Sequence, residues 1–161
     1  MQHTALLSSL YTAAQSRELD HIAITEFGIP GTELMERAGL ALFERLQQVW
    51  PSVRRITVLC GGGGNGGDGY VLPRLALAAG IDVTLYRFGA SGPEGAAAQA
   101  RARFLEVSQE RDVFSVELED TDLIVDALFG SGLDRPLSEA LQQLFFTINL
   151  SAIPVLSADL P

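Results

Sequence analysis

A glycine-rich stretch constrains the fold of this chain more than any other part. It runs from Cys60 to Gly69, reads Cys-Gly-Gly-Gly-Gly-Asn-Gly-Gly-Asp-Gly, and holds seven glycines in ten positions. An apolar run at 55–59 precedes it, and a segment with a helical pattern at 70–79 follows it. A strand, a glycine loop and a helix in this order aim backbone N–H groups at a bound anion. Because a simple turn needs only one or two glycines, the stretch predicts a ligand site.

Two helices are predicted ahead of the first strand. Thr12 and Gln15 have the spacing of a capping box, and Gly28 ends the helix that they begin. A second apolar stripe at helical spacing starts near Thr32 and stops at Pro51. These two helices form a lead-in to the rest of the chain.

Strands alternate with helices after this lead-in, which spans residues 10–50. The chain is expected to form strands at 55–59, 82–86, 122–126 and 154–158, a shorter strand at 113–117, and helices at 70–79, 94–107 and from Pro136 to about Ile148. The alternation is typical of a mostly parallel sheet with helices on both faces, a three-layer α/β/α fold. The α/β core would then occupy 55–161, and the 161 residues form a single domain.

The composition excludes several classes of protein. With a formal charge of −9, the chain will not bind nucleic acid through bulk electrostatics. All eleven basic residues are arginine, so a phosphate-loop NTPase and a Schiff-base enzyme, which need a lysine, are excluded. The single Cys60 allows no internal disulfide, and with His3 and His21 it gives no zinc-ligand spacing. No apolar run is long enough to cross a membrane. The single cysteine fits a reducing compartment, so a cytoplasmic protein is expected.

Polar groups follow three of the predicted strands at their carboxyl ends. The glycine stretch follows the first strand, Asp126 begins the loop that contains 130–136, and Asp159 follows the strand at 154–158. Ligands of parallel sheets bind beyond these ends, so we expect the three features to share one site. Asp126 is a hard oxygen ligand for a cation, or else an acceptor for loop amides. Asp159 is the candidate general acid/base, since no His, Cys or Lys competes with it there; its alternative role is turn formation.

The glycine stretch does not match an ordinary dehydrogenase loop. The pattern Gly-x-Gly-x-x-Gly at 62–67 fits the dinucleotide fingerprint formally, but no acidic residue ends the second strand to bind the ribose. Arg87 stands there instead, where it would face a 2′-phosphate. Asp68 lies at the start of the next helix, at the position that an anion would occupy. Asn65 and Asp68 also have a plain alternative role as helix caps.

Several separate motifs occur along the chain in one order. They are Tyr11-Thr-Ala-Ala-Gln15, Leu19-Asp20, Gly28-Ile-Pro30, Leu34-Met-Glu-Arg-Ala-Gly39, Gly64-Asn-Gly-Gly-Asp-Gly69, Asp126-Ala-Leu-Phe-Gly-Ser-Gly-Leu133 and Ser157-Ala-Asp-Leu-Pro161. Together they resemble the YjeF N-terminal domain, the NAD(P)HX epimerase family, over essentially the whole chain. The resemblance implies a Rossmann-like fold, a homodimer, and interconversion of the R and S epimers of hydrated NADH and NADPH. It also implies a potassium ion in the site and a partner dehydratase, which is fused C-terminally in many bacteria.

The resemblance also implies which residues form the site. Potassium would be held by Asn65 and Asp126, and Asp159 would contact the substrate. The other substrate-binding residues would come from the two loops: Gly64, Asn65, Gly66, Gly67, Asp68, Gly130, Ser131, Gly132, Leu133, Asp134, Arg135 and Pro136.

Two departures from the family pattern are visible. The family loop usually reads Asn-Asn-Gly-Gly-Asp, whereas Gly64 replaces its first asparagine here. The family motif continues past Pro161 with Ser-Gly, and that serine is a potassium ligand. We therefore expect a domain that is incomplete at its C-terminus.

The chemistry of epimerisation fits a carboxylate that alternates between acid and base. Asp159 is the first choice for this role. Asp68 is the second choice, because capping the helix would keep it ionised. Two other classes remain open, namely a non-catalytic scaffold for dimerisation or nucleotide sensing, and an NADP-binding oxidoreductase that uses Arg87.

Overall fold

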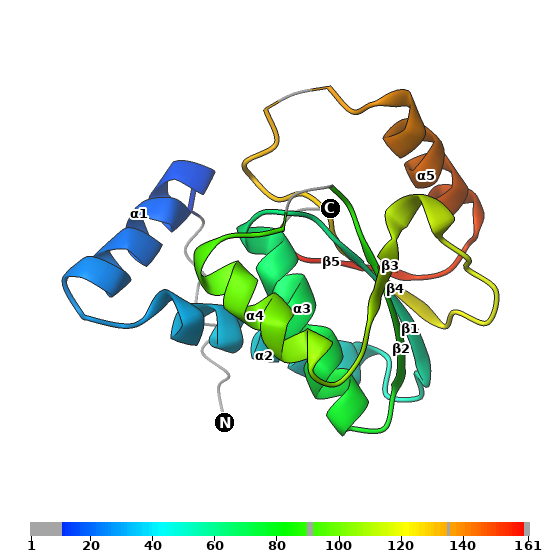
Figure 1. Cartoon of the computed structure of the whole chain (residues 1–161), viewed down its shortest axis with the longest axis horizontal. Coiled ribbons are helices and arrows are strands. Elements are labelled where there is room, and N and C mark those ends of the chain that lie inside the picture. The colour runs from blue at the N-terminus through cyan, green and yellow to red at the C-terminus, as the bar shows by residue number, and fades with distance from the viewer. Residues whose placement is uncertain (1–10, 90–91, 135, 160–161) are drawn as a thin grey trace, which may run out of the picture.

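A parallel sheet of five strands forms the centre of the structure, a computed structural model that describes residues 11–89, 92–134 and 136–159 (Figure 1). The strand order is β3-β2-β1-β4-β5, and every neighbouring pair is parallel. The strands are β1 (Arg55–Cys60), β2 (Asp82–Arg87), β3 (Glu110–Asp112), β4 (Leu123–Ala127) and β5 (Val155–Ser157). The predicted α/β class is therefore confirmed.

Helices cover both faces of this sheet, which gives three layers (Figure 1). One face carries α2 (Gly31–Val49), α3 (Gly64–Ala78) and α4 (Gly95–Leu105), which pack against one another. The other face carries α5 (Glu139–Leu150) and the short 3-10 helix η1 (Val113–Ser115). The first helix, α1 (Ala13–Thr25), lies at the edge of the molecule beside α2. In the described part of the chain, no helix is both long and apolar enough to cross a membrane.

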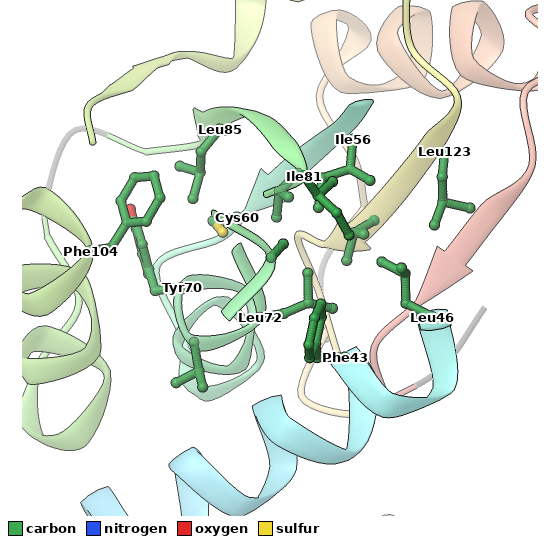
Figure 2. Packing of buried hydrophobic residues seen from close by; sticks show 14 of the residues in the cluster. Phe43, Leu46, Ile56, Cys60, Tyr70, Leu72, Ile81, Leu85, Phe104 and Leu123 are labelled. Carbon is green, nitrogen blue, oxygen red and sulfur yellow. The ribbon is translucent and has the colours of Figure 1, made fainter. Parts of the chain in front are cut away.

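The side chains of β1 alternate between the two hydrophobic clusters. Ile56, Val58 and Cys60 belong to the cluster beneath α2, α3 and α4, part of which Figure 2 shows. Leu59 belongs to the cluster beneath α5, whose apolar residues recur at helical spacing. A strand buried on both faces is an apolar run, which is why the sequence at 55–59 predicts it correctly.

The N-terminus of α1 has the expected capping box. Thr12 N–H donates to Gln15 Oε1 at 2.8 Å, and Gln15 N–H donates to Thr12 Oγ1 at 3.2 Å. The start of α5 differs from the prediction, which placed it at Pro136. The helix begins at Glu139 because Ser138 is its N-cap and accepts a hydrogen bond from Leu141 N–H.

Two further predicted boundaries are wrong. The helix after β1 begins at Gly64 and not at residue 70, so most of the glycine stretch is helical. The expected strand at 113–117 is absent from the described residues, because η1 occupies its first half. Asp112 turns the chain there by accepting a hydrogen bond from Phe114 N–H at 2.8 Å, and the edge strand β3 ends at Asp112.

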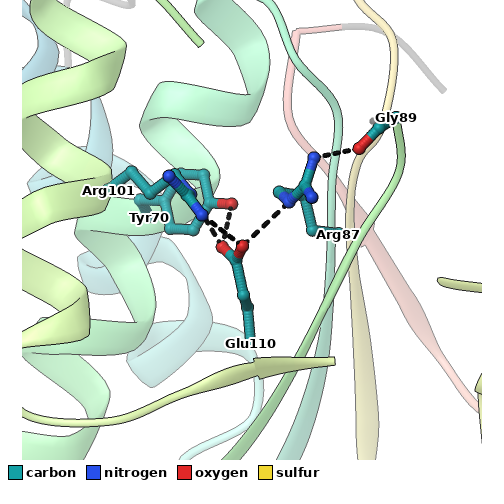
Figure 3. Close-up of polar contacts among 5 residues, drawn as sticks. All are labelled: Tyr70, Arg87, Gly89, Arg101 and Glu110. Atoms are coloured by element: carbon teal, nitrogen blue, oxygen red, sulfur yellow. Dashed lines mark hydrogen bonds and ion pairs between the residues drawn. The ribbon is translucent and has the colours of Figure 1, made fainter. Parts of the chain in front are cut away.

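The carboxylate of Glu110 connects four elements near β3, the edge strand opposite β5. Glu110 of β3 accepts hydrogen bonds from Tyr70 Oη of α3, Arg87 Nε of β2 and Arg101 Nε of α4, at 2.8, 2.8 and 2.9 Å (Figure 3). Arg87 also donates to the carbonyl oxygen of Gly89. Burial alone would raise the pKa of Glu110, but these hydrogen bonds outweigh it and lower the pKa to about 2.

Replacing Glu110 by glutamine tests this network. The variant keeps the shape but loses the charge, so its free energy of unfolding at pH 7 should fall by about 2–4 kcal/mol. A depressed carboxyl pKa stabilises the fold above its unfolded value of 4.5, and that gain disappears as the pH falls towards 2. Urea unfolding at pH 7 and pH 3 should therefore give a smaller difference at pH 3. Glu119→Gln, at an exposed position, is the matched control, and an equal difference at both pH values would contradict the interpretation.

Candidate functional site

The candidate site lies where the loops after β1 and β4 leave the sheet in opposite directions. These strands are neighbours, but β1 leads to α3 on one face and β4 leads to α5 on the other. Loops that diverge in this way open a crevice at the carboxyl edge, which is the usual ligand position in open α/β sheets. A cavity of about 610 Å³ occupies this place.

Both loops and the chain after β5 line this first cavity. Its described lining residues include 62–65 from the glycine stretch, 128–134 from the loop after β4, and Asp159. The structure thus brings together three features that are far apart in sequence, as the strand ends predicted. Phe88 from the end of β2 completes the wall, where it packs edge-on against Phe129 with ring centroids 5.7 Å apart.

The N-terminus of α3 lines this cavity through Gly63, Gly64 and Asn65. Its N-cap is Gly63, and no side chain caps the helix. Gly64 has open space where a side chain would begin, whereas a Cβ atom at Gly66 would collide with the backbone of Gly61. Helix N–H groups that lack an intrahelical partner favour an anion.

Asn65 connects the two loops and has one unused atom. Its Nδ2 donates to the carbonyl oxygen of Phe129 at 2.8 Å. Its Oδ1 is buried, and it has no hydrogen-bond partner among the described residues. Buried amide oxygens are nearly always satisfied, so this atom is ready to accept a ligand donor or a cation.

Asp159 has an unusual backbone conformation at the edge of the same cavity. Its φ of 67° lies in the left-handed region that few residues other than glycine adopt. Its Oδ2 accepts a hydrogen bond from Ser131 N–H at 2.6 Å. Gly130 has no side chain in the way, since a Cβ atom there would collide with this carboxylate. The loop after β4 is therefore shaped to hold this carboxylate.

Asp68 lines a second cavity of about 560 Å³, which lies between α1, α2 and the start of α3. One wall of this cavity is apolar and includes Leu34, Met35 and Leu42. The pKa of Asp68 is raised to about 7, first by burial and then by the negative charges of Asp20 and Asp159. A carboxyl group that titrates near neutral pH is suited to proton transfer.

The alternative role of Asp68 as a helix cap does not fit the structure, since no side chain caps α3. Asp68 lies one turn inside α3, beyond the position of an N-cap. The reason for ranking it below Asp159 as an acid/base therefore disappears.

The two cavities adjoin each other. Gly64, Asn65, Ser131, Asp159 and Arg17 line both of them. A ligand with two halves and a central linker matches such a pair of cavities.

The other residues assigned to the site from the sequence have different surroundings. Asp126 is half-buried at the end of β4, and its Oδ1 accepts a hydrogen bond from Leu128 N–H at 3.1 Å. Burial raises the pKa of Asp126, and this hydrogen bond partly opposes the rise. Asp126, Gly66, Gly67 and Pro136 are described residues that line neither of the two cavities, and Arg135 lies outside the described residues.

Two residues of α1 that were not among the predicted site residues line the cavities. Arg17 lines both cavities, and Asp20 lines the second. Their spacing of three residues places them on one helix face, which is the signal that was available. Phe88 was not predicted as a site residue either, because only its neighbour Arg87 was interpreted as a ligand contact at the end of this strand.

The polar atoms around Asn65 that have room for a ligand are oxygens. Within the ranges that the structure describes, no three His, Cys, Asp or Glu side chains cluster as for a divalent or transition metal. The orphaned Asn65 Oδ1 and the carboxylates nearby offer oxygen ligands, the type that replaces the hydration shell of potassium. Cys60 is fully buried, and burial raises the pKa of its thiol, so it is not a reactive thiolate.

The strand order, the uncapped helix after β1 and the paired cavities define a Rossmann-like α/β protein with a ligand site at the switch point. The chain belongs to the family described as YjeF-related protein N-terminus, whose model matches residues 31–161.

Named relatives agree with this assignment. The NAD(P)H-hydrate epimerase of Limosilactobacillus fermentum is 37% identical over 93% of this chain and 73% of its own length. The corresponding protein of Rhodobacter capsulatus is 36% identical over 96% of this chain and 77% of its own length. The bifunctional NAD(P)H-hydrate repair enzyme Nnr of Coxiella burnetii is 44% identical, and this chain spans 32% of it. The crystal structure of yeast YNL200c has the same fold, with a TM-score of 0.82 at 22% identity over 95% of this chain and 70% of that one.

Replacing Asp68 by asparagine tests its environment. Between pH 3.8 and about 7 the native state binds the proton and the unfolded state does not, so stability falls as the pH rises. The Asp68→Asn variant should lose this slope and exceed the parent by about 1–3 kcal/mol at pH 8. Urea unfolding between pH 5 and pH 8 measures the slope. The control variant Asp82→Asn, at an exposed position, should keep the parental dependence of stability on pH. If Asp68→Asn also keeps it, Asp68 is an ordinary carboxylate.

Proposed function

We propose that this protein is an NAD(P)H-hydrate epimerase, which interconverts the R and S forms of hydrated NADH and NADPH in cofactor repair. The observation that carries the proposal is the convergence of Asp159 and Asp68 on one cavity next to the uncapped start of α3. The family and the named relatives support the same activity, since the chain spans most of the length of the monofunctional ones.

The reaction inverts one carbon of the damaged cofactor. The hydrated ring carries a hydroxyl on C6, which is also bonded to the ring nitrogen. If the C–O bond breaks, the hydroxyl takes a proton and leaves as water, and the ring nitrogen supplies the electron pair to C6. Water then adds to the opposite face and gives a proton back, so atoms and charge balance. Breaking the C–N bond instead also requires proton transfers, so either path needs an acid and a base.

Asp68 and Asp159 are the two groups for these transfers. With a pKa of about 7, Asp68 carries a proton for much of the time near neutral pH and acts as the acid. Asp159 acts as the base, held by Ser131 N–H at the boundary of the two cavities. The apolar wall formed by α2 shields the ring from bulk water.

The start of α3 binds the anionic part of the substrate. Its uncapped N–H groups face the first cavity at Gly64, where no side chain blocks an approach. The loop at 130–134, including Gly132, Leu133 and Asp134, lines the opposite wall and would contact the nucleotide.

Potassium would be held by Asn65 and Asp126 in this proposal. The buried and unpartnered Oδ1 of Asn65 supports it, because a cation would satisfy this atom. When bound, the ion supplies positive charge among several carboxylates and fixes the loops after β1 and β4.

The protein would work beside a dehydratase that consumes the S form. Two relatives are named bifunctional repair enzymes, and this chain spans 32% and 30% of them. A homodimer and a cytoplasmic location, both expected from the sequence, remain parts of this proposal.

A coupled assay tests the activity. An R/S mixture of NADPHX is mixed with excess S-specific dehydratase, and the absorbance of NADPH is followed. The S form is consumed at once, and the remainder waits for epimerisation. The slow phase should accelerate in proportion to added protein and should be faster in potassium than in sodium. An unchanged slow phase with folded protein would favour the non-catalytic scaffold.

Single substitutions separate the roles of the carboxylates. Asp159→Asn should slow the slow phase by about 100-fold or more, because it removes the base. Asp126→Asn should instead raise the potassium concentration needed for half-maximal rate. Asp82→Asn, at an exposed position, is the control for both and should leave the rate unchanged. A parental rate in Asp159→Asn would remove Asp159 from the mechanism.

The structure argues against the alternative of an NADP-dependent oxidoreductase, in which Arg87 would bind the 2′-phosphate. Arg87 donates to Glu110 and to the carbonyl oxygen of Gly89, within the network of Figure 3. A side chain held in this way is not directed at a 2′-phosphate.

A further inference from the structure

The first helix has its polar side towards the site. Four residues of α1, namely Ser16, Arg17, Asp20 and Ile24, line the second cavity, and three of them are polar or charged. No residue of α1 is buried. Leu19 on the same helix is 48% exposed. Ile22 and Ala23 are half-buried, whereas Ser16, Arg17 and Asp20 are exposed and line the cavity. These polar side chains of α1 are therefore accessible to a ligand in the cavity.

Arg17 is the residue of this face whose charge has no partner. Within the described ranges, its side chain forms no ion pair and no hydrogen bond. It is also the one basic side chain among the described lining residues of both cavities. The other charged residues there are acidic: Asp20, Asp68, Asp134 and Asp159.

An anionic substrate cannot enter so acidic a site without compensation. The dinucleotide carries negative charge on its diphosphate, and the chain has a formal charge of −9. The helix N-terminus supplies only a partial positive charge. A guanidinium offers a full charge and several N–H donors that match phosphate oxygens.

The position of Arg17 indicates which phosphate it meets. It lines both cavities, and Gly64 and Asn65 at the start of α3 do the same. In a dinucleotide the diphosphate lies between the two nucleoside halves, so it would occupy this shared boundary. One half then lies in the first cavity, where Phe88 and Phe129 offer a stacking surface, and the reactive ring lies in the second beside Asp68.

We propose that Arg17 of α1 binds the diphosphate of the substrate and, together with the N-terminus of α3, holds it at the boundary between the two cavities. This inference rests on the proposed epimerase function for the identity of the dinucleotide. It assigns α1 to the binding site and not only to the scaffold.

The experiment compares Arg17→Gln, Arg17→Lys and the parent with NADHX and NADPHX in the coupled assay. The matched control is Arg45→Gln, which removes an exposed arginine of α2 that lines neither cavity. Arg17→Gln should raise KM about 10- to 100-fold for both substrates, since a charge-assisted contact is lost, and should change kcat much less. Arg17→Lys should recover part of the loss. Arg45→Gln should behave as the parent.

The affinity of the same proteins for ADP-ribose is measured by calorimetry. ADP-ribose contains the diphosphate but not the reactive ring. Arg17→Gln should weaken the binding of ADP-ribose to a similar degree. This result does not require the parent to epimerise its substrate, so the role of Arg17 and the epimerase function can fail separately. An unchanged KM, an unchanged affinity for ADP-ribose, or no binding of ADP-ribose by the parent would overturn the role of Arg17. A loss confined to NADPHX would also overturn it, because it would place Arg17 on the 2′-phosphate.

Discussion

The close packing of α3 against the sheet is the constraint on which the rest of the structure depends. A Cβ atom at Gly69 would lie 2.6 Å from the Cβ of Ala127 and 2.7 Å from the Sγ of Cys60. At Gly67 it would lie 2.5 Å from the thioether sulfur of Met35. Gly69 lets the helix approach β1 and β4 closely, and Gly67 lets it approach α2. This packing brings Asn65 to the point where the two loops diverge.

The same stretch therefore contains glycines of two kinds. Gly66, Gly67 and Gly69 are needed for packing, whereas Gly63 and Gly64 have open space at the helix start. A sequence of glycines cannot show this difference, because it depends on which neighbours the tertiary fold supplies. This is also why the helix could not be placed before residue 70 from the sequence: glycine has low helix propensity, and tertiary packing overrides it.

Much of the remaining architecture follows from local signals. The apolar run at 55–59 predicts β1, and the pair Thr12 and Gln15 predicts the cap of α1, because each depends on neighbours in sequence. The convergence of Asp159 with the glycine stretch follows from the rule for parallel strands. The environment of Asp68 and the position of Arg17 beside both cavities could not be predicted in this way, since both depend on how α1 lies next to the site.

The backbone conformation of Asp159 lowers the stability of the fold at the site. Its left-handed backbone is held by the loop around Gly130, and such a conformation is unfavourable by about 1–3 kcal/mol for a residue with a side chain. A glycine there would relieve this strain but would remove the carboxylate that Ser131 N–H binds. In the proposed mechanism the position is thus a trade-off between stability and function, because the less stable residue is the one that would supply the proton-transfer group.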